Sequence, residues 1–368
     1  MTLAVAIPAF GAWAYLLLGH ARFWQSGPAL APGRPDLAPP VDVVVPARDE
    51  AAGIGTALRS LLQQDYPGPI RLIVVDDGST DATGAIARAL PGVSVLDGRS
   101  RPPGWSGKLW AVAQGVEQAT ADYVLLTDAD IVHAPAHVAT LVAKAERDGL
   151  DLVSEMVALR CQSWAERALV PAFVFFFQLL FPFRAVNDPT RGVAAAAGGT
   201  MLVRRRALDR IGGIAAIRGA LIDDVALAAA IKRHGRIWLG HTALAASIRP
   251  YPGASDVWRM VARTAYVQLR FSPWVLAGTV AGLALVWLAP PLLALSAHGP
   301  AQWLGALAWL GSMLSFLPTL RRFGLSPAWA LALPGIACFY MAATLGSAWN
   351  HHRGRGVVWK RRAYGVEA

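Results

Sequence analysis

The sequence has 368 residues, of which 55% are hydrophobic and only 16% are charged. Soluble proteins average about 25% charged residues, so this composition excludes a chain that is soluble throughout and favours membrane-spanning segments. The net charge of +10 could indicate nucleic acid. However, no aromatic and basic reading module occurs, and basic residues beside apolar spans mark cytoplasmic sides and attract anionic lipid. We expect a membrane as a partner and no nucleic acid.

The chain opens with an apolar run, Leu3 to Leu18, which is followed by His20 and Arg22. No lysine or arginine precedes the run and no clean cleavage site of small residues follows it, so we interpret it as a retained membrane anchor rather than a signal peptide. Residues 25–40 are rich in Pro, Gly and Ala and predict a linker.

Beyond the linker, short aliphatic runs alternate with helical patterns. The runs predict strands at Val41–Val45, Ile70–Val75 and Tyr123–Thr127. The patterns predict three helices: one with Ile54, Leu58, Leu61 and Leu62 on a single face, one that starts near Thr80–Asp81 and ends at Leu90, and one at Lys108–Ala119. Such alternation predicts an α/β domain with a mostly parallel, Rossmann-like sheet covered by helices on both faces.

Polar side chains follow each of these strands. The three strand ends carry "PARDE" (Pro46–Glu50), "DDGST" (Asp76–Thr80) and "DAD" (Asp128–Asp130). Ligands bind beyond the carboxyl ends of parallel strands, and Mg²⁺ or Mn²⁺ takes one or two carboxylates together with phosphate oxygens. Each motif alone could be a turn or a helix cap, but their joint position favours a metal that holds a diphosphate. No dinucleotide-binding or P-loop motif occurs.

Five motifs in order make residues 41–271 resemble the family 2 glycosyltransferases, which have the GT-A fold. The motifs are "VVVPARDE", "IVVDDGSTDAT", "LLTDAD", "AAGGTMLVRRRAL" and "LIDDVALAAAIKRHG". The resemblance implies an inverting transferase that uses a nucleotide-sugar, usually a UDP-sugar, with Mg²⁺ or Mn²⁺. It also implies the donor-binding residues Pro46, Arg48, Glu50, Asp76, Asp77, Lys108 and Asp128. Asp128 and Asp130 would form the metal motif, with Asp130 the direct ligand, whereas Lys108 could equally be a solvated lysine at a helix start.

The acid pair in "IDD" (Ile222–Asp224) is the candidate catalytic group. Inverting transfer needs a base that takes the proton of the acceptor hydroxyl. The family usually has Glu-Asp with the second acid as base, so we assign Asp224 as the base and expect Asp223 to cap the helix that follows. Gly199, in "AAAAGGT", would let the backbone approach the donor sugar or the acceptor, or would serve packing.

The segment "WRMVARTAYVQLR" carries Arg263, a candidate phosphate contact. The signature of processive members is altered here, which disfavours a processive polysaccharide synthase. Together with the N-terminal anchor and the tail "VVWKRRAYG", this segment resembles the hopene-associated glycosyltransferases of bacterial hopanoid gene clusters. The resemblance implies a lipid acceptor of the hopanoid or polyprenyl type. A non-catalytic scaffold in a lipid-synthesis complex remains an alternative.

The C-terminal third is apolar, with no Asp, Glu, Lys or Arg from Phe271 to Leu320. Spans need about 20 apolar residues, and three segments qualify: about Pro273–Ala297, Gln302–Leu320 and Ala328–Trp349. A further apolar stretch, Ala168–Phe183, is short for a span and predicts either an interfacial helix or a buried core helix.

The expected organisation has five parts. They are an anchor at 1–24, a linker at 25–40, a GT-A domain at 41–271, a transmembrane region with two to three apolar segments at 272–350, and a basic tail at 351–368. We expect the bacterial inner membrane, with the catalytic domain in the cytoplasm, where sugar nucleotides are found. A cytoplasmic basic tail then requires an even number of crossings after the domain.

Overall fold

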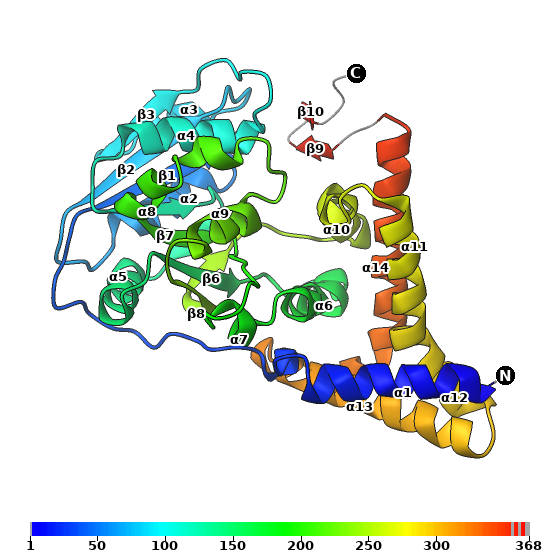
Figure 1. Ribbon diagram of the computed structural model, residues 1–368. Helices are drawn as coiled ribbons and strands as arrows, with labels where there is room; N and C mark the ends of the chain where they lie inside the picture. The colour runs from blue at the N-terminus through cyan, green and yellow to red at the C-terminus, as the bar shows by residue number, and fades with distance from the viewer. Residues whose placement is uncertain (1, 355–356, 360–361, 365–368) are drawn as a thin grey trace. The chain divides into compact units, whose positions relative to one another are not determined.

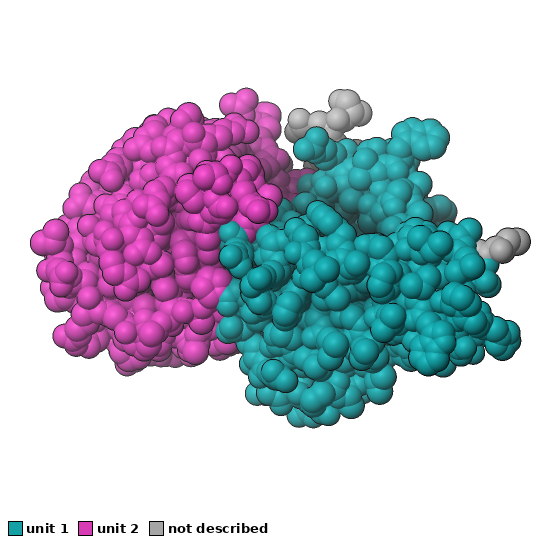
Figure 2. Space-filling model, turned by 60° about the horizontal axis from the view of Figure 1, so that its bottom comes forward, with its two compact units in different colours: residues 1–27, 161–184, 251–368 teal, residues 28–160, 185–250 magenta. Residues whose placement is uncertain are grey.

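A computed structural model describes residues 2–354, 357–359 and 362–364. The chain divides into two compact units, and each is assembled from separate stretches of sequence (Figure 2). Unit 1 comprises Met1–Gly27, Cys161–Arg184 and Tyr251–Ala368, and unit 2 comprises Pro28–Arg160 and Ala185–Pro250. The chain therefore enters unit 1 a second time between two parts of unit 2.

Unit 2 is built on an eight-stranded sheet with the order β3-β2-β1-β4-β7-β6-β8-β5 (Figure 1). The strands are β1 Val41–Ala47, β2 Ile70–Asp76, β3 Val93–Asp97, β4 Tyr123–Thr127, β5 Ile131–His133, β6 Leu152–Ala158, β7 Thr200–Arg204 and β8 Ile237–Ser247. Strands β1 to β4 run parallel, β7 is antiparallel to both of its neighbours, and β6 and β8 run parallel to each other. It follows that β1, β2, β4, β6 and β8 all point their carboxyl ends to one edge of the sheet.

Helices pack on this sheet. They are α2 Ile54–Leu62, α3 Thr83–Arg88, α4 Gly107–Gln118, α5 His137–Asp148, α8 Arg205–Arg210, η2 Ile214–Ile217 and α9 Asp223–Lys232, and α7 Phe183–Val186 contains residues of both units. On α2, Ile54, Leu58 and Leu61 are buried in the core with the central strand β1, as the spacing predicts. The three predicted strands and the predicted helices α2 and α4 are confirmed.

Helix α3 begins later than predicted. We expected a start near Thr80–Asp81, but the helix runs only from Thr83 to Arg88. The Asp81 carboxylate accepts hydrogen bonds from the backbone N–H of Thr83, at 2.9 Å, and from its hydroxyl, at 2.5 Å. Asp81 therefore forms a side-chain turn that precedes the helix, a common alternative for aspartate.

Unit 1 is helical and largely apolar. Its elements are α1 Thr2–Leu18, η1 Phe23–Gln25, α6 Trp164–Leu180, α10 Ala254–Gln268, α11 Pro273–Leu283, η3 Ala284–Leu288, α12 Ala289–Ser296, α13 Pro300–Arg322, η4 Pro327–Ala332, α14 Leu333–His352, β9 Val357–Trp359 and β10 Arg362–Tyr364. Three helical segments are long and apolar enough to cross a membrane: Pro273–Ser296, Pro300–Arg322 and Pro327–His352. The three predicted apolar segments are confirmed as helices. Near Pro290–Pro291 the first of them continues through the π-helical turn η3, a common way to relieve strain inside a helix.

The N-terminal helix α1 has 17 residues, about 26 Å at 1.5 Å per residue, and is shorter than the three spans. It lies along α13 (Figure 1), where Trp13 is buried and donates a hydrogen bond to the Val286 carbonyl at 2.8 Å. The helix is therefore an integral part of the apolar unit.

Helix α6 belongs to the core of unit 1. Phe175 is fully buried and lies 5.1 Å from Phe316, measured between ring centroids. Tyr340 of α14 donates a hydrogen bond to the Leu169 carbonyl at 2.8 Å. Of the two alternatives that the sequence left open for this stretch, the contacts within unit 1 support the packed core helix. Trp164 and Leu180, at its two ends, are exposed.

Candidate active site

The carboxyl edge of the sheet gathers the polar residues that follow four strands. Pro46 and Arg48 lie at the end of β1, Asp76 and Asp77 at the end of β2, and Asp128 and Asp130 after β4. Strand β8 adds a fourth group, since Arg249 stands two residues beyond its end. The strand-end rule therefore places these residues on one rim of unit 2.

The corner between β1 and β2 contains a buried ion pair. Arg48 Nη1 lies 3.5 Å from Asp77 Oδ2, and both side chains are at least nine-tenths buried. Arg48 also donates to the Asp77 carbonyl, while its Nε atom is buried without a hydrogen-bond partner. Asp76 instead accepts a hydrogen bond from Ser79 N at 2.9 Å and closes the turn after β2. An unpaired buried guanidinium N–H favours an anionic or carbonyl oxygen as its missing partner.

Lys108 joins two of the predicted acids. It stands in the first turn of α4, which Ser106 caps, and its Nζ lies 2.9 Å from Asp128 Oδ1 and 3.1 Å from Asp223 Oδ2. Burial works against its charge, but the carboxylates of Asp128 and Asp223 raise the pKa of Lys108. Burial raises the pKa of Asp128, and the Lys108 ammonium opposes that change. These contacts argue against a solvated lysine at a helix start, which was one of the two interpretations of Lys108.

Asp224 faces the same group. Its Oδ2 accepts a hydrogen bond from Gly198 N at 2.9 Å, and its Oδ1 accepts one from Val225 N at 2.8 Å. Burial, followed by the neighbouring charge of Asp223, raises the pKa of Asp224 to about 7. A carboxylate with such a pKa can both lose and accept a proton near neutral pH, which general-base catalysis requires.

The expected capping role of Asp223 is wrong. Helix α9 starts at Asp223 itself, with Ile222 at the N-cap position and no side-chain cap. Asp223 instead uses its carboxylate to hold Lys108. The glycine beside the acids is Gly198, because a Cβ there would lie 3.3 Å from Asp224 Oδ2, whereas a Cβ on Gly199 would meet Val157 at 3.2 Å.

Arg249 is a residue of this rim that the sequence did not reveal. Its Nε lies 2.6 Å from Asp130 Oδ2 and its Nη2 lies 2.7 Å from Glu50 Oε1. One guanidinium thus bridges the rim after β1 and the rim after β4. The end of β8 was the available signal, but the alanine-rich strand Ile237–Ser247 lacks the β-branched pattern that marked the others.

A divalent cation fits the two aspartates of "DAD" by ligand chemistry. In the described residues, no three His, Cys, Asp or Glu side chains gather as a metal site. Mg²⁺ and Mn²⁺ nevertheless need only one or two carboxylates when a diphosphate supplies further oxygens. Asp128 pairs with Lys108 through Oδ1 and Asp130 pairs with Arg249 through Oδ2, so each carboxylate has a second oxygen that these two ion pairs do not use.

A small hollow opens beside Lys108 in unit 2. It is lined by Pro46, Lys108, Leu109, Val112, Leu126, Thr127, Asp128, Gly198, Met201, Ile214, Ile217, Asp223 and Leu227. Its lining is mostly apolar and includes three charged side chains, Lys108, Asp128 and Asp223. Arg263 lies on α10 of unit 1, so it is not among the residues that unit 2 brings together here.

Comparison with known proteins agrees with this architecture. Residues 42–212 match the family profile described as glycosyl transferase family 2. A curated relative, the 4,4'-diaponeurosporenoate glycosyltransferase of Staphylococcus aureus strain MRSA252, is 40% identical over 90 residues. That match covers 24% of this chain and 23% of the relative, so the chain spans about a quarter of the relative's length.

Among solved structures, a mannosyltransferase from Pyrobaculum calidifontis in complex with GDP-Man and Mn²⁺ matches with a TM-score of 0.58 and 21% sequence identity. The match covers 95% of this chain and 99% of that one. At this identity the likeness shows the fold alone. The predicted α/β class, a GT-A domain with apolar C-terminal helices, is confirmed.

Proposed function

We propose that this protein, whose residues 42–212 match the glycosyl transferase family 2 profile, is a membrane-bound inverting enzyme that moves one sugar from a nucleotide-sugar to a lipid. The observation that carries the proposal is the group at the strand ends, in which Lys108 joins Asp128 to Asp223 beside Asp224. In this proposal, the base that deprotonates the acceptor hydroxyl and the charged groups that bind the donor diphosphate belong to one small group of side chains.

The donor side uses the residues at the ends of β1, β2 and β4. Arg48 and Asp77 would hold the nucleotide, with Pro46, Glu50 and Asp76 shaping the same corner. Asp130, with Asp128, would hold Mg²⁺ or Mn²⁺, which supplies positive charge to the diphosphate as it leaves. Lys108 and Arg249 add two cations next to these aspartates. A UDP-sugar is our leading donor, and the GDP-Man of the Pyrobaculum structure makes a GDP-sugar the first alternative.

The acceptor side uses Asp224 as the base. Its carboxylate takes the proton of the acceptor hydroxyl as that oxygen attacks the anomeric carbon, and the bond to the diphosphate breaks. The two backbone N–H groups of Gly198 and Val225 fix the orientation of the carboxylate. Inversion follows, because a single displacement occurs with no covalent intermediate on the enzyme.

A lipid acceptor is supported by two observations. The curated relative is named for 4,4'-diaponeurosporenoate, and three helices of this chain are long and apolar enough to cross a membrane. We propose the bacterial inner membrane as the location, a cytoplasmic catalytic domain, and a hopanoid or polyprenyl-type acceptor. Arg263 stays in this proposal as a predicted phosphate contact.

The test is a transfer assay on membranes that contain the full chain. Labelled UDP- and GDP-sugars are supplied with Mn²⁺, and the extracted lipids are analysed by mass spectrometry. We expect one labelled sugar per lipid from the wild type and at least about a hundredfold less product from Asp224→Asn. Longer glycan chains would favour a processive synthase instead, and no lipid product from any donor would refute the proposed function.

A further inference from the structure

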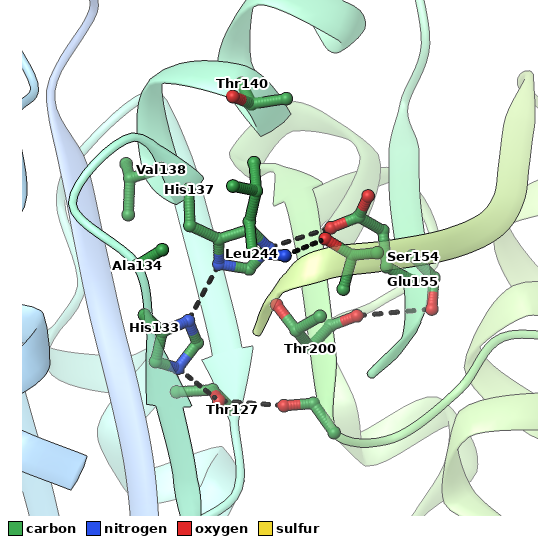
Figure 3. Close-up of polar contacts among 12 residues, drawn as sticks. Thr127, His133, Ala134, His137, Val138, Thr140, Ser154, Glu155, Thr200 and Leu244 are labelled. Carbon is green, nitrogen blue, oxygen red and sulfur yellow. Dashed lines mark hydrogen bonds and ion pairs between the residues drawn. The ribbon is translucent and has the colours of Figure 1, made fainter. Parts of the chain in front are cut away.

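Unit 2 contains a line of buried polar side chains that the proposed mechanism does not use. Thr127 Oγ1 lies 3.1 Å from His133 Nε2, His133 Nδ1 lies 2.8 Å from His137 Nδ1, and His137 Nε2 lies 2.8 Å from Glu155 Oε2. Figure 3 shows these contacts as one continuous chain from Thr127 to Glu155. None of the four residues is more than 2% exposed. We call this line the histidine relay.

The relay connects four different elements of the sheet unit. Thr127 ends β4, His133 ends β5, His137 begins α5, and Glu155 lies within β6. Among the residues that the structure describes, the polar partners of Glu155 are His137 and the hydroxyl of Thr242, and neither is a lysine or an arginine. Its second oxygen, Oε1, is buried without a partner. A carboxylate ion in such a place costs far more free energy than a neutral acid does.

The charge state of the two histidine rings limits how many protons the relay can hold. Burial lowers the pKa of His133 well below its ordinary value and lowers that of His137 to about 3, so both rings are neutral at pH 7. A neutral imidazole has one N–H and one acceptor nitrogen. The two Nδ1 atoms can therefore share only one proton, and its position decides the direction of every other bond in the relay.

One end of the relay has a fixed direction. Thr127 Oγ1 lies 2.8 Å from the carbonyl oxygen of Gly199, which can only accept, so the hydroxyl donates there. His133 must then donate to Thr127 from Nε2 and accept at Nδ1. His137 must donate from Nδ1 and accept at Nε2. The last step requires a proton on Glu155, which therefore donates to His137 as a neutral acid.

The opposite arrangement has an equally strict consequence. If Glu155 loses its proton, His137 must donate to it from Nε2, and His133 must donate to His137 from Nδ1. His133 then accepts at Nε2, so the single proton of Thr127 turns to His133. The Gly199 carbonyl loses its hydrogen bond. The gain or loss of a proton at Glu155 therefore makes or breaks the hydrogen bond to the Gly199 carbonyl, at the other end of the relay.

Gly199 adjoins the candidate base. The preceding residue, Gly198, donates its N–H to Asp224 at 2.9 Å. Asp128, which pairs with Lys108, directly follows Thr127. The relay therefore ends on the two backbone segments that position Asp224 and Asp128.

We propose that His133, His137 and Glu155 are positioning residues, which hold Thr127 against Gly199 and so aim Asp224 and Asp128, and that they do so only while Glu155 carries a proton. The catalytic part of this proposal rests on the proposed function, whereas the proton arrangement does not. Burial raises the pKa of Glu155 to about 8, in agreement with a neutral acid at pH 7.

The described polar groups around Glu155 bring no charge to it. His137 from α5 lies beside it, with His133 of β5 beyond and Thr200 of β7 nearby (Figure 3). The hydroxyl of Thr242 from β8 is also a hydrogen-bond partner of Glu155. The proton on Glu155 is consequently set by its own burial and by the two neutral rings.

The first experiment needs no substrate. Nitrogen-15 NMR of labelled histidine, in the full chain in detergent, identifies which ring nitrogen carries the proton. At pH 7 we expect Nε2–H on His133 and Nδ1–H on His137, with both tautomers exchanged above about pH 8. His133→Asn and His137→Asn assign the signals. The reverse tautomers at pH 7, or tautomers that do not change between pH 6 and 9, would overturn the proton arrangement.

The second experiment measures transfer with UDP-glucose or GDP-mannose as donor and vesicles of bacterial lipid extract as acceptor. In Glu155→Gln the amide N–H₂ replaces the acid O–H toward His137. We expect a kcat within about twofold of wild type at pH 7 and no loss at pH 9, where the wild type falls about tenfold. Glu155→Leu should lose about tenfold in kcat at pH 7.

Thr127→Val removes the link to Gly199 without changing the shape of the side chain, and it serves if Glu155→Leu does not fold. We expect about a tenfold lower kcat at pH 7 and no further fall at pH 9. A Glu155→Gln variant that is folded but inactive, or that keeps the wild-type loss at pH 9, would overturn the positioning role. If the wild type transfers no sugar from either donor, the proposed function fails, while the NMR result still decides the relay.

Discussion

Acidic side chains are handled in two different ways in the sheet unit. At the rim, Asp128, Asp223 and Asp130 each lie within 3.1 Å of a lysine or arginine nitrogen. In the interior, Glu155 is just as close to His137, and the part of the chain that the structure describes places no lysine or arginine beside it. Position along the strand makes the difference: side chains beyond a strand end can reach cations and ligands, whereas one inside β6 has strands on both sides. The rim acids are thus suited to bind charge, and the interior acid is suited to hold a proton.

The largest effect is expected at the rim. Asp224→Asn keeps the shape of the side chain but removes the proton acceptor, so transfer should fall about 10²- to 10⁴-fold. Asp97→Asn is the matched control, because that aspartate is 83% exposed and forms its ion pair with Arg88. Rates of labelled-lipid formation measure both variants. Equal losses in the two would contradict the assignment of Asp224.

Removal of the rim lysine should weaken donor binding. Lys108→Met leaves Asp128 and Asp223 without their shared cation, and a charged hydrogen bond of this kind contributes about 1.5–3 kcal/mol. We expect about ten- to hundredfold weaker binding of UDP or GDP with Mn²⁺, measured by calorimetry. Lys144→Met, which loses a pair with Asp148 on α5, should bind as the wild type does. Unchanged binding in Lys108→Met would remove Lys108 from the donor site.

The rim should also govern the acidic side of the pH profile. The pKa of Asp224 is raised to about 7 by burial and by the charge of Asp223. Only the ionised form is a base, so the rate should rise with pH through about 7 and fall about tenfold per unit below it. In Asp223→Asn the neighbouring charge is gone, so the midpoint should move to lower pH. A profile that does not move would exclude coupling between the two acids.

The protonation of Glu155 should make the stability of the protein depend on pH. The pKa of Glu155 is raised from 4.5 to about 8 in the folded chain, so folding favours its protonated form. The resulting gain in the free energy of unfolding is complete below pH 4.5. It is lost as the pH rises through about 8, by at most about 1.4 kcal/mol per pH unit. Below about pH 6.5 the two buried histidines act in the opposite direction, because burial lowers their pKa values.

Between pH 6.5 and 8 the histidines no longer contribute, and Asp224, whose pKa is raised to about 7, is common to the two proteins compared. Over this range the Tm of the wild type should fall relative to that of Glu155→Gln, which has no proton to lose at this position. Thermal melts of both proteins in the same detergent measure the difference. Parallel curves would mean that Glu155 is already ionised at pH 6.5.

The elements that carry the rim could be predicted because their signals are local. Aliphatic runs such as Val41–Val45 end in polar residues, and the strand-end rule converts that order into a shared edge. The apolar spans were equally plain, since no charged residue occurs from Phe271 to Leu320. In both cases, residues that are neighbours in the sequence are sufficient to predict the element.

What escaped prediction depends on contacts between distant residues. Arg249 reaches Glu50 across 199 positions of sequence, and no local pattern marks that pairing. Likewise, Glu155 lies in the middle of a strand, and the hydrophobic pattern around it gives no indication of its role. His133 follows the "DAD" motif and resembles an ordinary strand residue. Asp223 looked like a helix cap, a role that aspartate fills well in general, until Lys108 was found beside it.

The most direct test of the central claim is a structure of the full chain with a nucleotide-sugar and Mn²⁺. The claim is that the rim of unit 2 binds the donor with its anomeric carbon toward Asp224. We predict the diphosphate beside Asp128, Asp130 and Lys108, and the sugar between them and Asp224. A donor bound away from this rim, with Asp224 remote from the sugar, would contradict it.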